Sequence, residues 1–177
     1  KFSAAHPAAS VVGLRYFNVF GPGEARKGRG ASMVCQLASQ LIRGERPRLF
    51  HDGFQARDFV PVQDAVDATL AASGLFGPPA KPGVYNVGSG SPLTFNALLA
   101  TLREALGVSE SRSPTDFVPM PGSIRAFYQD FAQADLSRAA SGLRWEPGRD
   151  ARDAIRAYAN WLQGEIGTSN DISEIGA

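Results

Sequence analysis

Short apolar runs alternate along the chain with longer segments of helical spacing. The mostly apolar run Val11–Phe17 predicts a buried strand. Shorter strands are expected at Arg48–Phe50, Asp58–Val60 and Gly83–Val87. The residues between Asn18 and Gly30 are rich in glycine and basic side chains, so they predict a loop.

Helical segments occupy much of the remaining chain. Ala31–Arg43 has helical composition and precedes Gly44, a residue type that suits the left-handed end of a helix. Thr94 is placed to cap a helix that runs towards Leu106. Further helices are predicted at Gln63–Ser73, Gln133–Ser141 and Asp150–Gln163.

The alternation of helices with short strands indicates an α/β architecture. The strands are too few for a complete doubly wound sheet, and the first of them follows Lys1 with almost no lead-in. We therefore expect residues 1–164 to form the carboxy-terminal part of a larger fold. The polar residues 165–177 lack periodicity and are expected to be a flexible tail.

Composition limits the classes of function. The 177 residues are 44% hydrophobic, and 18 basic against 17 acidic side chains leave a net charge of +1, which favours neither nucleic acid nor an anionic membrane surface as a partner. The single cysteine, Cys35, excludes an intramolecular disulfide, and His6 and His51 have no second metal ligand at suitable spacing, so no metal is expected. No segment reaches the roughly 18 apolar residues of a membrane span, and the default location is the cytoplasm.

The most informative cluster lies where the first predicted strand ends at a polar amide. Arg15–Pro22 reads Arg-Tyr-Phe-Asn-Val-Phe-Gly-Pro, so Asn18 follows the strand shortly before a turn. Ligands of open α/β sheets bind beyond the carboxyl ends of strands, which places the Asn18 amide where it can hold a sugar hydroxyl. The alternative is an Asx turn, in which the side chain only closes the local backbone.

Three motifs together resemble one enzyme class. The strand-Arg-x-x-Asn-x-x-Gly-Pro pattern around Asn18 is similar to the signature of extended short-chain dehydrogenase/reductase enzymes, which include nucleotide-sugar epimerases and dehydratases. Arg57–Val60 with Asp64, and Val84–Gly90, resemble the other two landmarks of that class in the same order. The glycines of Val84–Gly90 lack the third glycine of a dinucleotide fingerprint and predict a strand-to-helix turn. The resemblance implies a Rossmann-like fold with a small substrate-binding domain.

Two further stretches resemble the heptose 6-epimerase family within that class. They are Lys27–Ser32 and Tyr128–Leu136, and the similarity extends from about Val11 to Leu162. The resemblance implies a homo-oligomeric enzyme that interconverts the D-glycero and L-glycero forms of ADP-manno-heptose by transient oxidation at C6, with NADP, or NAD, as cofactor. Residues 1–164 would then be mainly substrate-binding, with the late elements of the Rossmann fold.

Lys27 is the candidate acid/base. Arg26, Lys27 and Arg29 place positive charges side by side, and a neighbouring cation disfavours an ammonium ion and makes a lysine a better proton acceptor. An isolated lysine in such a loop is more often a solvated surface charge. By resemblance, Lys27 is one of two proton-transferring residues and contacts the cofactor together with Val19. The other is the tyrosine of a Tyr-x-x-x-Lys motif; we interpret Lys1 as the end of that helix, so the tyrosine and the Gly-rich cofactor loop would precede it.

The remaining substrate contacts also follow from the resemblance. They are Asn18, Arg29, Gln36, Phe50, His51, Asp52, Gly53, Arg57 and Tyr128. An arginine can hold two phosphate oxygens at once, which suits Arg57 to a diphosphate, whereas its alternative is a surface ion pair with Asp58 or Asp64. The alternative for Tyr128 is a core aromatic.

The sequence departs from the family pattern at two positions, and two other interpretations of its function remain. Gln36 stands where the family usually has a histidine, and His51 where an acidic residue is common. Another nucleotide-sugar epimerase or dehydratase of the same class would share Asn18 and Asn86 but would not need Lys27. A non-catalytic ADP-sugar-binding module is the alternative from a different class, if the natural protein had no preceding half.

Overall fold

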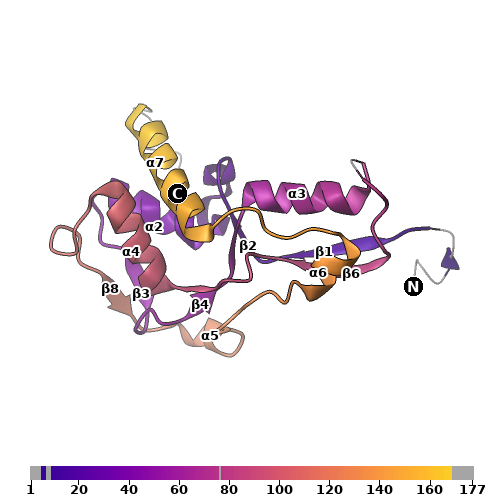
Figure 1. Ribbon diagram of the computed structural model, residues 1–177. Coiled ribbons are helices and arrows are strands. Elements are labelled where there is room, and N and C mark those ends of the chain that lie inside the picture. The colour runs from indigo at the N-terminus through magenta and orange to yellow at the C-terminus, as the bar shows by residue number, and fades with distance from the viewer. Residues whose placement is uncertain (1–4, 7–8, 76, 169–177) are drawn as a thin grey trace.

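The computed structural model describes residues 5–6, 9–75 and 77–168, which form two packed regions side by side (Figure 1). The strands are β1 (Val12–Tyr16), β2 (Asn18–Phe20), β3 (Arg48–Phe50), β4 (Ala56–Arg57), β5 (Phe59–Pro61), β6 (Gly83–Val87), β7 (Leu93–Thr94) and β8 (Asp116–Val118). The helices are the 3-10 helix η1 (Glu24–Gly30), α2 (Met33–Ile42), α3 (Val62–Ser73), α4 (Phe95–Leu106), α5 (Gly122–Arg125), α6 (Ser137–Gly142) and α7 (Ala151–Thr168). Helices and parallel strand pairs confirm the α/β prediction.

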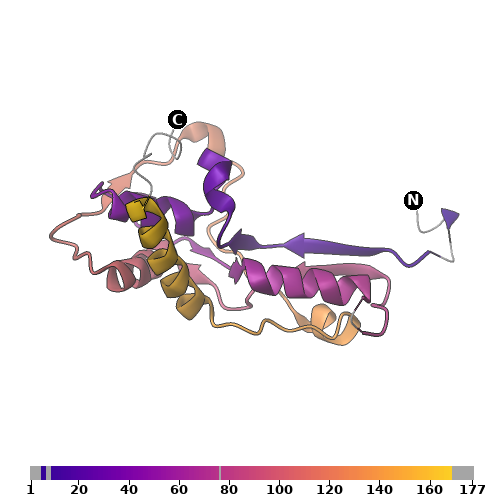
Figure 2. The same ribbon diagram turned by 90° about the horizontal axis from the view of Figure 1, so that it is seen from above.

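The first region is built on the parallel pair β1 and β6. Val12 lies opposite Gly83 and Tyr16 opposite Val87, and β1 and α3 run side by side in both views (Figures 1 and 2). Helix α6 packs on β6. The buried side chains between these elements form the sheet core: Ala65, Ala68, Ala80, Tyr85, Val87, Ala139, Leu143 and Trp145.

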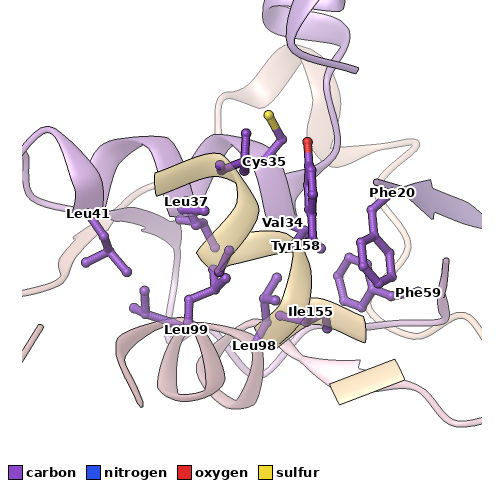
Figure 3. Close-up of a cluster of buried hydrophobic side chains, with 14 of the residues drawn as sticks. Phe20, Val34, Cys35, Leu37, Leu41, Phe59, Leu98, Leu99, Ile155 and Tyr158 are labelled. Carbon is purple, nitrogen blue, oxygen red and sulfur yellow. The ribbon is translucent and has the colours of Figure 1, made fainter. Parts of the chain in front are cut away.

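The second region is a bundle of α2, α4 and α7, which pack against one another. Their apolar faces meet in the helical core, where Leu37, Leu98 and Ile155 are fully buried (Figure 3). Burying a leucine or isoleucine side chain stabilises a fold by roughly 1.5–3 kcal/mol, so this cluster is the main source of stability for the bundle.

Strand β2 connects the two regions. It pairs in parallel with β5, so that Asn18 lies opposite Phe59 and Val19 opposite Val60. Val19 packs against the sheet core, whereas the next residue, Phe20, is buried in the helical core. Successive side chains of a strand point to opposite sides, so one short strand can contribute to both cores.

The predicted helix boundaries agree well where a side chain caps the backbone. The Ser32 hydroxyl accepts from the Cys35 amide at 3.2 Å at the start of α2, and the Thr94 hydroxyl accepts from the Ala97 amide at 3.1 Å at the start of α4. Gly44, just beyond α2, has a φ of 72°, the left-handed conformation expected there.

The prediction of a loop from Asn18 to Gly30 was wrong, because this stretch contains β2 and η1. Strand β2 forms because the Asn18 amide donates to the Asp58 carbonyl at 3.1 Å and the strand then runs in register with β5. Pairing between segments so far apart in the sequence leaves no local pattern of apolar residues.

The helix predicted at Gln133–Ser141 begins only at Ser137. The residues before it are held outside a helix, since the Ala134 amide donates to the Asp58 carboxylate at 2.9 Å and the Asp135 carbonyl accepts from the Asn86 side chain at 3.2 Å. Both partners are remote in the sequence, so composition alone overestimated this helix.

The last helix extends past its predicted end. Helix α7 continues beyond Gln163 to Thr168, while the rest of the predicted tail, residues 169–177, lies outside the described residues, as does Lys1. In the described part of the chain, no helix combines the length and apolar character that a membrane span requires.

Candidate functional site

A pocket of about 700 Å³ lies where β2, η1, α2, β3 and β4 come together. It collects seven of the side chains predicted from the sequence: Asn18, Val19, Lys27, Gln36, Phe50, Arg57 and Tyr128. Its other lining residues include Glu24, Ser32, Met33, Gln40, Arg48, Phe59, Phe95 and Val118. Segments that lie far apart in the sequence therefore meet at this one pocket.

Asn18 lines the pocket and is held by two hydrogen bonds to a single carbonyl group. Its backbone amide and its side-chain nitrogen both donate to the Asp58 carbonyl, at 3.1 and 3.0 Å. Because that carbonyl can only accept, the side-chain nitrogen must face it, and the side-chain oxygen is left to accept from a ligand hydroxyl. The side chain spans two strands, so the bond differs from the local Asx turn that was the alternative.

The Arg57 side chain lines the pocket and lies against two aromatic rings. Its guanidinium carbon lies 4.9 Å from the ring centroid of Tyr128 and 5.9 Å from that of Phe95, and one nitrogen donates to the Ala56 carbonyl at 2.9 Å. Guanidinium groups stack favourably on aromatic faces. The rings hold the side chain in place while leaving donors for an anion.

The alternative role of Arg57, an ion pair with Asp58 or Asp64, is contradicted. Asp58 accepts from the backbone amides of Ser89 and Gly90, and Asp64 pairs with Arg149. Both carboxylates are fully buried and occupied elsewhere. Among the described residues, Arg57 forms no ion pair.

Tyr128 joins the main pocket to a second one. Its ring meets Phe50 edge to face, with centroids 6.0 Å apart, and it is half-buried at the pocket wall rather than in either core. Burial raises the pKa of the Tyr128 phenol, and Arg57 acts in the opposite direction. The hydroxyl is therefore protonated at neutral pH and able to donate.

The turn after β3 divides its side chains between two pockets. Phe50 lines the main pocket, while His51 and Asp52 line a neighbouring pocket of about 430 Å³ that also contains Tyr128. Gly53 is buried beneath the turn with a φ of 71°, and a side chain there would collide with Asn96. Of this predicted substrate-contact turn, only Phe50 lines the main pocket.

Arg29 and Gln36, both predicted substrate contacts, differ in their relation to the main pocket. Arg29 is exposed and does not line the main pocket, whereas Gln36 does. The Gln36 side-chain nitrogen donates to the Ala31 carbonyl at 2.7 Å, so it braces the segment between η1 and α2. Its oxygen remains as the polar atom that a ligand can meet.

Lys27 projects from η1 at the rim of the pocket, and its side chain is exposed. It also lines a smaller pocket of about 190 Å³ that continues past Val19 to Gly21 and Val62. Gly21 has a φ of 143°, and a Cβ atom there would lie 2.6 Å from a Val62 methyl carbon, so only glycine fits this turn.

Glu24 is the functional candidate that sequence reasoning missed. Its side chain is 4% exposed, and its carboxylate accepts hydrogen bonds from Gly21 and Ser32 at the two ends of the loop that carries Lys27. The available signal was that Glu24 is the single acidic residue between Asn18 and Gly30.

Asp58 organises the turn predicted at Gly88–Gly90. Its carboxylate accepts from the amides of Ser89 at 2.6 Å and Gly90 at 2.9 Å, and a Cβ atom on Gly88 would approach it to 2.8 Å. The amides of this turn thus bind an internal carboxylate. The prediction of a structural turn rather than a dinucleotide fingerprint is confirmed.

Cys35 on α2 and Tyr158 on α7 lie together at the helical core (Figure 3). Burial raises the pKa of both side chains, and the Glu24 carboxylate acts in the same direction on each. The Cys35 thiol is buried and remains protonated at neutral pH, so it is not a nucleophile. Among the described residues, no group of three or more His, Cys, Asp and Glu side chains is placed to hold a metal ion.

Comparison with known proteins identifies the family of this chain. The chain is 33% identical, over 171 residues, to an ADP-L-glycero-D-manno-heptose-6-epimerase of Cupriavidus pinatubonensis, with 87% of this chain and 51% of that protein covered. The sequence model of the NAD dependent epimerase/dehydratase family matches residues 1–88. The chain belongs to this family.

The epimerase/dehydratase chain is also similar to solved structures of nucleotide-sugar enzymes. An ADP-L-glycero-D-manno-heptose-6-epimerase of Helicobacter pylori superposes with a TM-score of 0.77 at 32% identity, over 95% of this chain and 48% of that one. A UDP-glucose 4-epimerase of Thermotoga maritima, solved with UDP-glucose, also gives 0.77, at 28% identity, over 93% and 50%. The chain therefore spans about half the length of these relatives, and its fold is the predicted portion of the Rossmann-like fold of extended short-chain dehydrogenases/reductases.

Proposed function

We propose that the natural protein interconverts the two C6 epimers of ADP-glycero-D-manno-heptose. The observation that carries this proposal is the meeting of Lys27, Asn18 and Arg57 in one pocket. A proton-transferring ammonium group, a hydroxyl-binding amide and a diphosphate-binding guanidinium are the groups such a substrate needs. The similarity to two proteins named as ADP-L-glycero-D-manno-heptose-6-epimerases supports the choice of sugar.

Each residue has a distinct role in the proposal. Asn18 accepts from a sugar hydroxyl, and Arg57 binds the diphosphate while Tyr128 donates to it or to the adjoining ribose. Phe50 forms the apolar wall of the sugar subsite, and Gln36 offers its side-chain oxygen. His51 and Asp52 contact the part of the nucleotide that enters the second pocket.

Lys27 moves the proton at the reacting carbon's hydroxyl. A tyrosine that would precede Lys1 in the natural protein serves the opposite face of the sugar, as the family resemblance predicts. Holding both groups against a bound sugar converts proton transfer into an intramolecular step. Arg29 is exposed and lies outside the main pocket. Its expected contact with the substrate therefore requires its side chain to turn towards that pocket.

A nicotinamide dinucleotide, NADP or NAD, is the cofactor we infer. The smaller pocket has an apolar wall at Val19 beside the Lys27 ammonium, which suits a flat aromatic ring that carries a polar amide. When bound, the dinucleotide would supply reversible hydride transfer at the sugar carbon. In this chain, Val19 and Lys27 would hold it next to the sugar subsite.

We further propose that residues 1–164 supply mainly the substrate side of the enzyme. Strands β1 and β6 with helix α3 would be late elements of the Rossmann sheet, and α2, α4 and α7 would form the substrate-binding part. The two separate cores support this division.

Epimerisation of a UDP-hexose at C4 is the second candidate, favoured by the likeness to the Thermotoga maritima enzyme. The test uses the full-length natural protein with NADP or NAD, and follows epimer formation by NMR from ADP-heptose and from UDP-glucose. We expect kcat/KM for ADP-heptose to exceed that for UDP-glucose by a factor on the order of 100 or more, since a site built for particular hydroxyls rejects other sugars strongly. Preferential conversion of UDP-glucose would overturn the proposal and select the second candidate.

A further inference from the structure

A buried carboxylate closes the loop that carries Lys27. One Glu24 oxygen accepts from the Gly21 amide at 3.1 Å and from the Ser32 hydroxyl at 2.9 Å, and the other accepts from the Ser32 amide at 2.7 Å. The loop leaves β2 at Gly21 and enters α2 at Ser32, so these three bonds join its two ends across a single side chain.

The Glu24 side chain also lies beside Lys27 on the same 3-10 helix. In such a helix, residues three apart are eclipsed, so the two side chains emerge from the same edge of η1. Both line the main pocket and the smaller one. Immediately after Lys27 the backbone departs from helical geometry at Gly28, with φ 51° and ψ −124°, so local helix bonds alone do not hold this segment.

Glu24 is a buried acidic residue that is held by hydrogen bonds alone. The side chain is 4% exposed, and it forms no ion pair among the described residues. Burying a charge without a counter-ion is unfavourable unless hydrogen bonds repay it. Packing alone does not require a carboxylate at this position. Fixing the two ends of the loop with three charge-assisted hydrogen bonds does require one.

We propose that Glu24 is a positioning residue for the proposed reaction, which holds the Gly21–Ser32 loop in the conformation that presents Lys27 to the sugar. Glutamine cannot reproduce the arrangement, because its NH2 group would face a donor at Gly21 or Ser32. Displacement of Lys27 by about an ångström is enough to lower the rate of proton transfer on the order of 100-fold. This inference rests on the proposed function.

The kinetic test is a double-mutant cycle in the full-length protein with Glu24→Gln and Lys27→Ala. We expect Glu24→Gln to lower kcat on the order of 100-fold with KM changed less than about threefold, and to add nothing in the Lys27→Ala background. Ser32→Ala, which removes one of the three bonds and also the cap on the Cys35 amide, should give a smaller loss that also disappears in that background. Glu146→Gln, at an exposed site, is the matched control and should leave kcat unchanged.

A purely structural role predicts a different pattern. Losses that add fully to that of Lys27→Ala, or an unchanged kcat in Glu24→Gln, would overturn the inference. If Glu24→Gln does not fold, the Ser32→Ala cycle decides by the same criterion.

A second readout does not depend on the substrate. The rate at which acetic anhydride acylates Lys27, measured by mass spectrometry relative to Lys81, should change at least about threefold in Glu24→Gln, because a released loop alters the exposure of the lysine. An unchanged ratio would contradict positioning even if the enzyme acted on another sugar. Wild-type turnover in Lys27→Ala would instead refute the proposed function and leave this readout valid.

Discussion

Arg57 shows how the surroundings of one residue decide its role. Both neighbouring carboxylates are occupied, and the guanidinium lies against the rings of Tyr128 and Phe95 at the wall of the pocket. A planar group of the kind that can form two parallel hydrogen bonds with a phosphate is therefore held at the pocket wall. Lysine retains the charge but has neither the planar shape nor the fork of donors.

We predict that Arg57→Lys weakens ADP binding by the full-length protein about 10- to 100-fold, which corresponds to the loss of bidentate geometry and ring stacking. Isothermal titration calorimetry with ADP measures this. Arg46→Lys is the matched control, because Arg46 pairs with Asp116 at 2.6 Å and does not line the pocket. An equal Kd for Arg57→Lys and the wild type would show that Arg57 does not bind the phosphates.

The sequence predicted those site residues whose side chains belong to a recognisable motif. Asn18, Lys27, Arg57 and Tyr128 were predicted as site residues, and all four line one pocket, although their roles stay predictions. Glu24 was missed because its function lies in bonds to backbone amides, which a residue pattern does not display.

At the scale of elements, one carboxylate ties three segments together. Asp58 immediately precedes β5 and is fully buried, and it accepts hydrogen bonds from Ser89, Gly90 and the segment before α6. These bonds fix the turn after β6 and prevent the predicted helix from starting at Gln133. The position of α6 therefore depends on a residue far away in the sequence.

Asp58→Asn should lower the free energy of unfolding by about 3 kcal/mol, because the amide group places donors against donors in a buried site. Urea denaturation followed by circular dichroism gives the value. The control is Asp67→Asn on α3, where the exposed side chain pairs with Arg149 and a change below about 1 kcal/mol is expected. Equal stability of the two variants would mean that the Asp58 bonds contribute nothing net.

Elements with local signals were predicted closely, and elements made by distant pairing were not. Helix α4 begins next to the predicted cap Thr94, helix α2 ends just before the predicted Gly44, and β6 has its predicted bounds. Strands β7 and β8 were not predicted, since β8 exists through its pairing with β3 and β7 through its pairing with β4. Two- and three-residue strands carry too few side chains for a periodicity to be visible.

At the scale of the whole molecule, the pocket depends on how the two cores are joined. β2 contributes Val19 to the sheet core and Phe20 to the helical core, and it places Asn18 between them. The alternation of elements predicted the fold class, but the side-by-side arrangement in Figure 1 follows from parallel pairings that no local pattern specifies. The helices α2 and α4 of the bundle then bring Gln36 and Phe95 to the same pocket.

The central claim is that this pocket binds a nucleotide sugar and that Lys27 transfers a proton within it. The most direct test compares the full-length wild type with Lys27→Ala, with ADP-heptose epimerisation followed by NMR and ADP affinity by calorimetry. We predict a fall in kcat on the order of 1,000-fold, the range of general acid–base catalysis, with the Kd for ADP changed less than about threefold. Wild-type turnover by Lys27→Ala would contradict the account.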